Sequence, residues 1–334
     1  MRQLHLRCTR PMIRVSGFRI VAGGHGHPTT VLDTHQLEAV LPNLESGWVG
    51  DRLGMKTRRV ALPHERVADL GIDATAQALE RAGWVGDDLD LIVCGASFLE
   101  DLMPSRASVV AQALNPHAVA FDVNAACSSA LYAIAVAHSM MSVDPSLRRA
   151  AVCVVERPTA SADYRDSRSS VFFGDSAACL LVERSEDSAE TGFAIDVIAM
   201  LNDATNAEAV RVPRNGHFHH DNREAFRHAM NMGEQVALAA LEGAAIGVDD
   251  VDFLVGHQAN QSVLGSLGDR LGIPWEKQWH NFEWAGNQGA AGVLTAFCGE
   301  WYTHLDELTV GDRVMLNTVG SGYTGAAILL RWMG

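Results

Sequence analysis

The sequence lacks the features that would point to a membrane or to nucleic acid. No apolar run approaches the roughly 18 residues that a transmembrane helix needs, and the N-terminus has no apolar segment of signal-peptide length. Positive charge is scarce, because 26 lysines and arginines face 40 aspartates and glutamates, giving a formal net charge of −14. General nucleic-acid binding needs a basic surface, so we expect neither a nucleic-acid nor a membrane partner.

Paired cysteines and nucleotide-binding motifs are also missing. The six cysteines include no Cys-x-x-Cys pair, and several lie in apolar runs, as buried reduced thiols do. We therefore expect a reducing, cytoplasmic compartment. There is no P-loop and no Gly-x-Gly-x-x-Gly after a strand. Two histidine groups, His25 with His27 and the histidines at 217, 219 and 220, lack partners at metal-ligand spacing, so we expect solvated loops and no metal.

The chain resembles itself in two places. Residues 78–93 (ALERAGWVGDDLDLIV) align without a gap with residues 240–255 (ALEGAAIGVDDVDFLV), and residues 174–182 are similar to residues 322–330. The similarity is either a coincidence between common helix–loop–strand units or the mark of two related α/β halves. We favour two halves, at 1–186 and 187–334, joined by a polar linker at 185–192.

Apolar periodicity predicts alternating helices and strands. We expect helices over 65–82, 128–141 and 224–242, and strands over 118–123, 151–155, 253–255 and 314–316. The 128–141 helix is apolar almost all round, so it should be buried. Buried apolar strands between helices indicate mostly parallel sheets covered by helices on both faces.

Cys127 lies where an expected strand ends, after a turn of small residues and before the buried helix. At a helix start, backbone N–H groups and the helix dipole should favour a thiolate and lower the thiol pKa. The alternative is a packed, inert cysteine, which is how we interpret the other five.

Two further small-residue turns carry polar side chains. His257 follows the strand at 253–255, and is either a hydrogen-bonded core imidazole or a catalytic group. Asn287 precedes a helix, and either caps it or points its amide into a pocket. A Gly-rich turn at 320–322 exposes backbone N–H groups that, with the Cys127 N–H, could form an oxyanion hole.

These groups suit one chemistry. A cysteine can hold an acyl group as a thioester, while His257 and Asn287 donate hydrogen bonds to an enolate oxygen. Loss of CO2 from a malonyl-type thioester would generate that enolate, and no metal or redox cofactor would be required.

The motifs AACSS (125–129), GHQAN (256–260), GNQGAAG (286–292) and GSGYTGA (320–326) resemble, in order and spacing, β-ketoacyl-acyl-carrier-protein synthase III and its thiolase-superfamily relatives. The resemblance covers the chain from about Met12. It implies a Cys127 nucleophile, decarboxylation and condensation at His257 and Asn287, and oxyanion donors from Cys127 and Ser321. It also implies a homodimer of two duplicated halves, in layered α-β-α-β-α architecture, that takes coenzyme A or acyl-carrier-protein thioesters.

More peripheral roles follow from the same resemblance. Trp48, Arg52 and Arg168 match positions that hold coenzyme A or phosphopantetheine, and ordinary surface charge is the alternative. Arg227 would dock an acidic carrier protein, which a chain of net charge −14 would otherwise repel. Met103 matches a residue that reaches across the dimer into the partner's acyl pocket.

The sequence departs from the family pattern at several positions. Ser262 stands where an arginine is common, the oxyanion turn reads Gly-Ser-Gly rather than Gly-Gly-Gly, and Ser128-Ser129 replaces a pair that usually ends in glycine. A weaker coenzyme A phosphate contact favours specialised polyketide or fatty-acid-derived metabolism over the start of fatty acid synthesis. Three other functions stay open: acyl transfer to an alcohol or amine, joining of two β-ketoacyl chains into a pyrone or diketone, and a non-catalytic scaffold.

Overall fold

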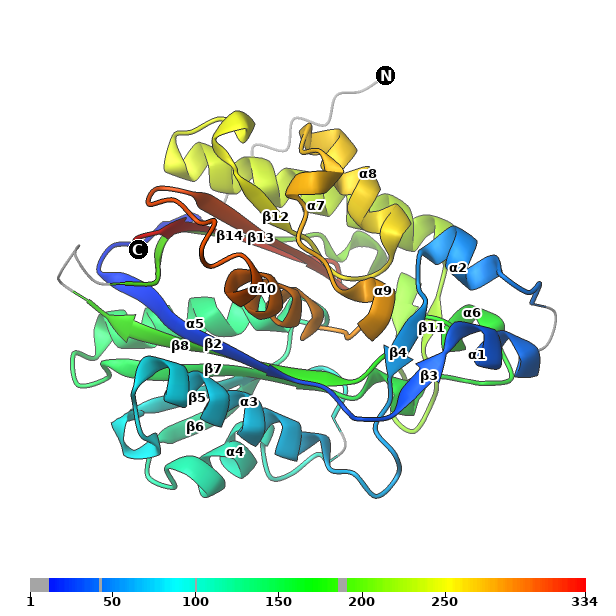
Figure 1. The fold of residues 1–334 in the computed structure, drawn as a ribbon, viewed down its shortest axis with the longest axis horizontal. Helices are drawn as coiled ribbons and strands as arrows, with labels where there is room; N and C mark the ends of the chain where they lie inside the picture. The colour runs from blue at the N-terminus through cyan, green and yellow to red at the C-terminus, as the bar shows by residue number, and fades with distance from the viewer. Residues whose placement is uncertain (1–11, 42–43, 100, 186–190) are drawn as a thin grey trace.

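The computed structural model describes residues 12–41, 44–99, 101–185 and 191–334 (Figure 1). Its main sheet has the order β12-β13-β14-β9-β2-β8-β7-β5-β6, with β1 paired to β9. The strands are β1 (Met12–Arg14), β2 (Phe18–Gly26), β5 (Leu91–Gly95), β6 (Val119–Val123), β7 (Arg149–Glu156), β8 (Ser176–Arg184), β9 (Phe193–Asn202), β12 (Phe253–Val255), β13 (Arg313–Gly320) and β14 (Thr324–Trp332).

The sheet contains the same arrangement twice. β5 runs parallel to β7, β7 antiparallel to β8, and β8 antiparallel to β2. β12, β13, β14 and β9 repeat these orientations in the same order. The two halves meet where β2 pairs with β9, at Arg19–Ala194 and Ile20–Phe193. The duplicated halves are thus confirmed, while the boundary expected between 186 and 187 lies outside the described residues.

The expectation of mostly parallel pairing is wrong. Among the described strands of the main sheet, only β5–β6, β5–β7 and β12–β13 are parallel. Parallel neighbours need a crossover connection, usually a helix, whereas antiparallel strands can follow one another through a tight turn. β13 reaches Gly320 and β14 begins at Thr324, so these strands return directly as a hairpin. Apolar composition reports burial of a strand but not its direction.

The aligned sequence segments form equivalent structures. The helix α3 (Val67–Ala82), a single 3-10 turn at Gly86–Asp88 and β5 correspond to α7 (Asn222–Ala244), a turn at Val248–Asp250 and β12. Each segment also makes an equivalent hydrogen bond to the neighbouring strand. The Asp90 carboxylate accepts from the Arg149 N–H at 3.0 Å, and the Asp252 carboxylate accepts from the Arg313 N–H at 2.9 Å.

Helices and sheets alternate in five layers (Figure 1). α5 (Ser129–Val143) and α10 (Gly292–Thr303) form the middle layer, and each contacts strands of both halves. The outer face of the first half packs on α3 and α4 (Arg106–Leu114). The outer face of the second half packs on α7 and α8 (Gln261–Leu271). This is the expected α-β-α-β-α arrangement of the thiolase fold.

The central helix qualifies one statement about the sequence. Ala126–Val143 is long and apolar enough, by length and composition, to cross a membrane, contrary to our expectation that no stretch would be. Most of the side chains of α5 lie in the core shared by the two halves. A helix buried between two sheets is apolar all round for that reason.

Short elements gather at one end of the molecule (Figure 1). They are β3 (Val31–Asp33), β4 (Thr57–Arg59), α1 (Thr34–Val40), α2 (Trp48–Leu53), α6 (Ser167–Ser170), β10 (Val210–Arg211), β11 (His219–His220) and α9 (Phe282–Ala285). Further 3-10 turns cover Pro158–Ser161, Ala204–Ala209 and Trp275–Lys277.

His25 and His27 do not lie in a solvated loop, so that prediction is wrong. β2 continues through His25, and the His27 ring packs edge-on against His25 and Trp284, with centroids 5.4 Å and 4.8 Å away. Burial lowers the pKa of His27 to about 3, helped by the nearby charges of His25 and Arg59. Glycines beside both histidines gave the sequence a loop-like character that the packing overrides.

Candidate active site

Cys127 follows a tight turn between β6 and α5. Ala126 has φ 49°, a left-handed conformation that few non-glycine residues adopt. The Ser129 hydroxyl accepts from the Ala125 N–H at 2.8 Å and donates to the Ala126 carbonyl at 2.6 Å, which stabilises the turn. Cys127 therefore stands two residues before the first residue of α5, as the sequence predicted, and keeps partial solvent exposure.

The expected lowering of the thiol pKa is wrong. Burial raises the pKa of Cys127 to about 12, and the negative charge of Glu156 adds to the rise. A hydrogen bond from backbone N–H acts in the other direction but is the smaller effect. The helix dipole stabilises a thiolate only modestly, whereas removal from water strongly favours the neutral thiol. In the free protein the sulfur is therefore a protonated thiol at neutral pH.

The Gly-rich turn after β13 packs directly against the cysteine turn. A Cβ placed on Gly320 would lie 2.6 Å from the Ala125 carbonyl oxygen and 3.0 Å from the Cys127 nitrogen. Thr324 donates from its hydroxyl to the same Ala125 carbonyl at 2.9 Å. The Ser321 hydroxyl donates to the Val210 carbonyl, so its side chain is engaged there. Backbone atoms of the two predicted oxyanion turns thus lie next to each other.

His257 lies two residues beyond β12, at the strand end where it was expected. Burial lowers the pKa of its imidazole to about 4, so the ring is neutral at physiological pH. Its Nδ1 is sealed from solvent and has no hydrogen-bond partner among the described residues. A neutral imidazole can donate one hydrogen bond from the nitrogen that carries the proton.

Asn287 is held by backbone pairing with the segment before β8. Its N–H donates to the Phe172 carbonyl at 2.8 Å, and its carbonyl accepts from the Gly174 N–H at 3.0 Å. The side-chain oxygen accepts from the Gly289 N–H at 3.1 Å. Because α10 begins only at Gly292, the helix-capping alternative is wrong.

Buried amides join the histidine and asparagine turns. The Gln258 side-chain oxygen accepts from the Asn281 N–H at 3.0 Å, and Gln288 donates to the Asn281 side-chain oxygen at 2.8 Å. All three side chains are nearly inaccessible to solvent. Sequence analysis missed this network, although a glutamine directly follows both His257 and Asn287.

Glu156 is a second residue that sequence analysis missed. It ends β7 completely buried, its negative charge acts on the Cys127 thiol, and its carboxyl carbon lies 3.6 Å from a Cβ placed on Gly289. Burial raises the pKa of its carboxyl group to about 7 despite three hydrogen bonds that oppose the rise. A carboxylate after the apolar run AVCVV, at a strand end, was a detectable signal.

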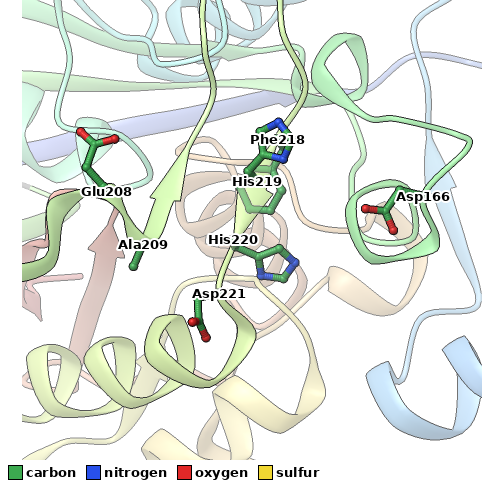
Figure 2. Close-up of a pocket in the computed structure, with 7 residues that line it drawn as sticks. All are labelled: Asp166, Glu208, Ala209, Phe218, His219, His220 and Asp221. Atoms are coloured by element: carbon green, nitrogen blue, oxygen red, sulfur yellow. The ribbon is translucent and has the colours of Figure 1, made fainter.

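A pocket of about 320 Å³ lies at β11 and the start of α7 (Figure 2). The Phe218 ring contacts Phe173 edge-on at a centroid distance of 4.9 Å, and Phe173 is bridged to Asn287 through the backbone. The pocket thus adjoins the asparagine turn through aromatic side chains. Its lining residues are Asp166, Glu208, Ala209, Phe218, His219, His220 and Asp221.

The peripheral candidates are spread over the surface. Trp48 and Arg52 are exposed on α2, where the Arg52 carbonyl accepts from the Ser262 hydroxyl at 3.2 Å. Arg168 lies in α6, and its side chain is outside the described part. Arg227 is exposed on α7 and pairs with Glu224. Met103 is 84% exposed.

Comparison with known proteins gives matches over most of the chain. The family models for 3-oxoacyl-[acyl-carrier-protein] synthase III match residues 121–199, and its C-terminal part matches residues 241–332. The β-ketoacyl-[acyl-carrier-protein] synthase III of Rhizobium meliloti is 32% identical over 94% of this chain and 99% of its own. The chain belongs to the β-ketoacyl-acyl-carrier-protein synthase III family. It is a condensing enzyme of the ketosynthase acyltransferase class.

Solved structures of the synthase III type have the same fold. The Aquifex aeolicus enzyme superposes with a TM-score of 0.87 at 29% identity, covering 95% of this chain and 100% of its own. The priming β-ketosynthase of the R1128 polyketide pathway gives a TM-score of 0.85 at 26% identity, covering 96% and 98%. OleA of Xanthomonas campestri, at 20% identity and a TM-score of 0.86, shows a likeness of fold alone.

Within the described residues of this synthase, no three or more His, Cys, Asp or Glu side chains are grouped so as to hold a metal ion. The histidines at 219 and 220, expected in a solvated loop, form β11 and line the pocket.

Proposed function

We propose that this synthase loads an acyl group onto Cys127 and condenses it with a malonyl- or β-ketoacyl-type thioester. One observation carries the proposal: the Gly320 turn packs on the backbone of the cysteine turn, while buried amides join the His257 and Asn287 turns. The cysteine, histidine and Gly320 turns follow β6, β12 and β13 of one sheet, and the asparagine turn lies between α9 and α10. The reaction needs no resident cofactor, because coenzyme A or a carrier protein brings each substrate as a thioester.

The two steps place different demands on these groups. In the first, the Cys127 sulfur attacks the acyl carbonyl, the thiol proton leaves with the departing carrier thiol, and backbone N–H groups of Cys127 and Ser321 stabilise the oxyanion. In the second, the malonyl group loses CO2, and the enolate carbon attacks the acyl-cysteine and releases the Cys127 thiolate, which takes up a proton from solvent to restore the thiol. Neutral His257 and Asn287 donate hydrogen bonds to the enolate oxygen. The imidazole of His257 does not need to be charged for this role.

The test is mass spectrometry of the intact protein with a panel of acyl thioesters, followed by CO2 release from malonyl thioesters. We expect an adduct on the wild type and none on Cys127→Ala. Asn287→Asp should keep the adduct and lose condensation by about 10²–10³, the cost of one oxyanion donor. A wild-type protein that forms no adduct and releases no CO2 with any donor is not the enzyme proposed. If Asn287→Asp leaves product formation intact, the reaction is simple acyl transfer.

Specialised polyketide or fatty-acid-derived metabolism fits the departures from the family pattern. Ser262 provides a hydroxyl that bonds the Arg52 carbonyl, where the family often places a phosphate-binding arginine. The likeness to a polyketide priming synthase points in the same direction. We therefore propose that acyl carrier proteins deliver the substrates, with Trp48, Arg52 and Arg168 along the path of the phosphopantetheine and Arg227 at the docking surface. Paired assays with matched coenzyme A and carrier-protein donors test this assignment.

We also propose that the synthase acts as a homodimer in the cytoplasm. β6 is an edge strand of the main sheet within the described residues, Val119 on it is 47% exposed, and Met103 is 84% exposed. An unpaired edge strand is a template for pairing with a second copy. The five described cysteines are free thiols, as in a reducing compartment. Light scattering should give twice the mass of the chain, and Val119→Asp should lower it.

A further inference from the structure

Glu156 makes three hydrogen bonds, and the proposed reaction gives this residue no role. Its Oε1 accepts from the Ser97 N–H at 3.0 Å and from the Ser97 hydroxyl at 2.6 Å, and its Oε2 accepts from the Phe98 N–H at 2.7 Å. Both oxygens are therefore engaged by two consecutive residues that follow β5. A buried carboxylate is costly unless it is hydrogen-bonded, and these three bonds offset part of that cost.

The segment that Glu156 holds borders the asparagine turn. The Phe98 ring lies 3.3 Å from a Cβ placed on Gly289, two residues after Asn287, and 5.8 Å from the ring of Phe173. Phe173 in turn contacts Phe218 in the wall of the 320 Å³ pocket. Phe98 is thus the first of a series of aromatic side chains that leads from the asparagine turn to the pocket.

We propose that Glu156 is a positioning residue that fixes Phe98 as one wall of the acyl-binding cavity and so determines which acyl groups Cys127 accepts. The inference rests on the proposed function, because it assumes that Cys127 is acylated. An aromatic wall excludes bulky chains only if its backbone cannot retreat. Two hydrogen bonds to Ser97 and one to Phe98, all from one buried carboxylate, prevent that retreat.

The same carboxylate gives the proposal an independent readout. Its charge raises the pKa of the Cys127 thiol, and Arg106 is the cation that acts on Glu156 in the opposite sense. Glu156→Gln keeps the shape but removes the charge and one acceptor, since an amide has a single oxygen. The thiol pKa should therefore fall, with about tenfold more thiolate for each unit at a pH below the pKa.

The experiment compares Glu156→Gln with wild type and with Glu183→Gln. Glu183 lies on β8 opposite Arg149, at the far end of β7 from Glu156. Arg149 and Glu156 are seven residues apart, or about 23 Å at 3.3 Å per residue. We measure acylation rates over a series of straight and branched acyl thioesters, and iodoacetamide alkylation of Cys127 against pH. For Glu156→Gln we expect the acylation rate with bulky donors, relative to that with short donors, to rise by about tenfold or more. Alkylation of Cys127 should be faster. Glu183→Gln should match wild type in both.

Phe98→Ala tests the wall directly and covers the case in which Glu156→Gln does not fold. It should shift the donor ratio in the same direction, because the wall itself is removed while Glu156 is still present. Unchanged donor ratios in Phe98→Ala, or in folded Glu156→Gln, overturn the inference while leaving the proposed function intact. If no thioester acylates the wild type, the proposed function is refuted. The pH dependence of alkylation then still measures the effect of the Glu156 charge on the Cys127 thiol.

Discussion

Gly320→Ala is the sharpest perturbation that the structure offers. The added methyl carbon would lie 2.6 Å from the Ala125 carbonyl oxygen, 2.8 Å from the Thr324 hydroxyl and 3.0 Å from the Cys127 nitrogen. The threonine side chain can rotate away, but the other two atoms are backbone. The Gly-Ser-Gly turn must therefore move away from the cysteine turn.

The magnitude follows from two separate effects. Overpacking of this kind costs about 1–3 kcal/mol of folding stability. At about 2.1 cal/mol/K per residue over 334 residues, 1 kcal/mol lowers Tm by roughly 1.5 °C, so the loss is about 1.5–4 °C. A displaced oxyanion donor costs about 10²–10³ in rate. Activity should thus fall far more than stability.

The first assay measures the rate of Cys127 acylation by intact-protein mass spectrometry of samples quenched at successive times. The second measures thermal unfolding. The matched control is Gly265→Ala within α8, where an added Cβ meets nothing within 4 Å. Because alanine favours a helix by about 0.5–1 kcal/mol over glycine, this variant should be as active as wild type and slightly more stable. Wild-type acylation by folded Gly320→Ala would refute the assignment of this turn to the oxyanion hole.

Three further predictions address other parts of the molecule. Arg227→Glu should raise KM for carrier-protein donors by roughly fivefold, about 1 kcal/mol, in a salt-dependent manner, and leave coenzyme A donors unaffected; equal effects on both donors would contradict docking at this residue. His27 has a pKa of about 3 against an ordinary 6.5, so the unfolded chain binds more protons between these values. Stability should fall by about 1.4 kcal/mol for each pH unit below 6.5 on its account, and urea titrations should show a flatter dependence for His27→Gln. Phe193→Ala should cost about 3–5 kcal/mol, since the buried ring packs on Phe297, Trp301 and Trp332; a denaturation midpoint like that of wild type would contradict this.

Much of the fold could be predicted because its determinants are local. The apolar run at 151–155 lies in β7, the all-round apolar segment at 128–141 lies in α5, and Gly83 ends α3 with φ 67°. The alignment of 78–93 with 240–255 located the repeat, since equivalent loops conserve the aspartates that bond the neighbouring strand. The order of the four sequence motifs predicted the family because each motif is a short local segment.

What sequence analysis missed depends on contacts between distant segments. The pKa of Cys127 rises because the surrounding protein excludes water and, to a smaller extent, because Glu156 on β7 adds negative charge. The burial of His27 depends on Trp284, which lies far away in the chain. Strand direction in β8 and β14 depends on connection geometry. None of these can be read from periodicity, which describes one segment at a time.

The seam between β2 and β9 has a wider consequence. The register there has two residue pairs, yet the first half supplies the cysteine and the second half the histidine and asparagine. Neither half alone contains all three of the proposed catalytic residues, even though each has strands and outer helices of its own. A chain cut between β8 and β9 would therefore give two inert fragments, and any recovered turnover on mixing them would report their reassembly through the shared middle layer of helices.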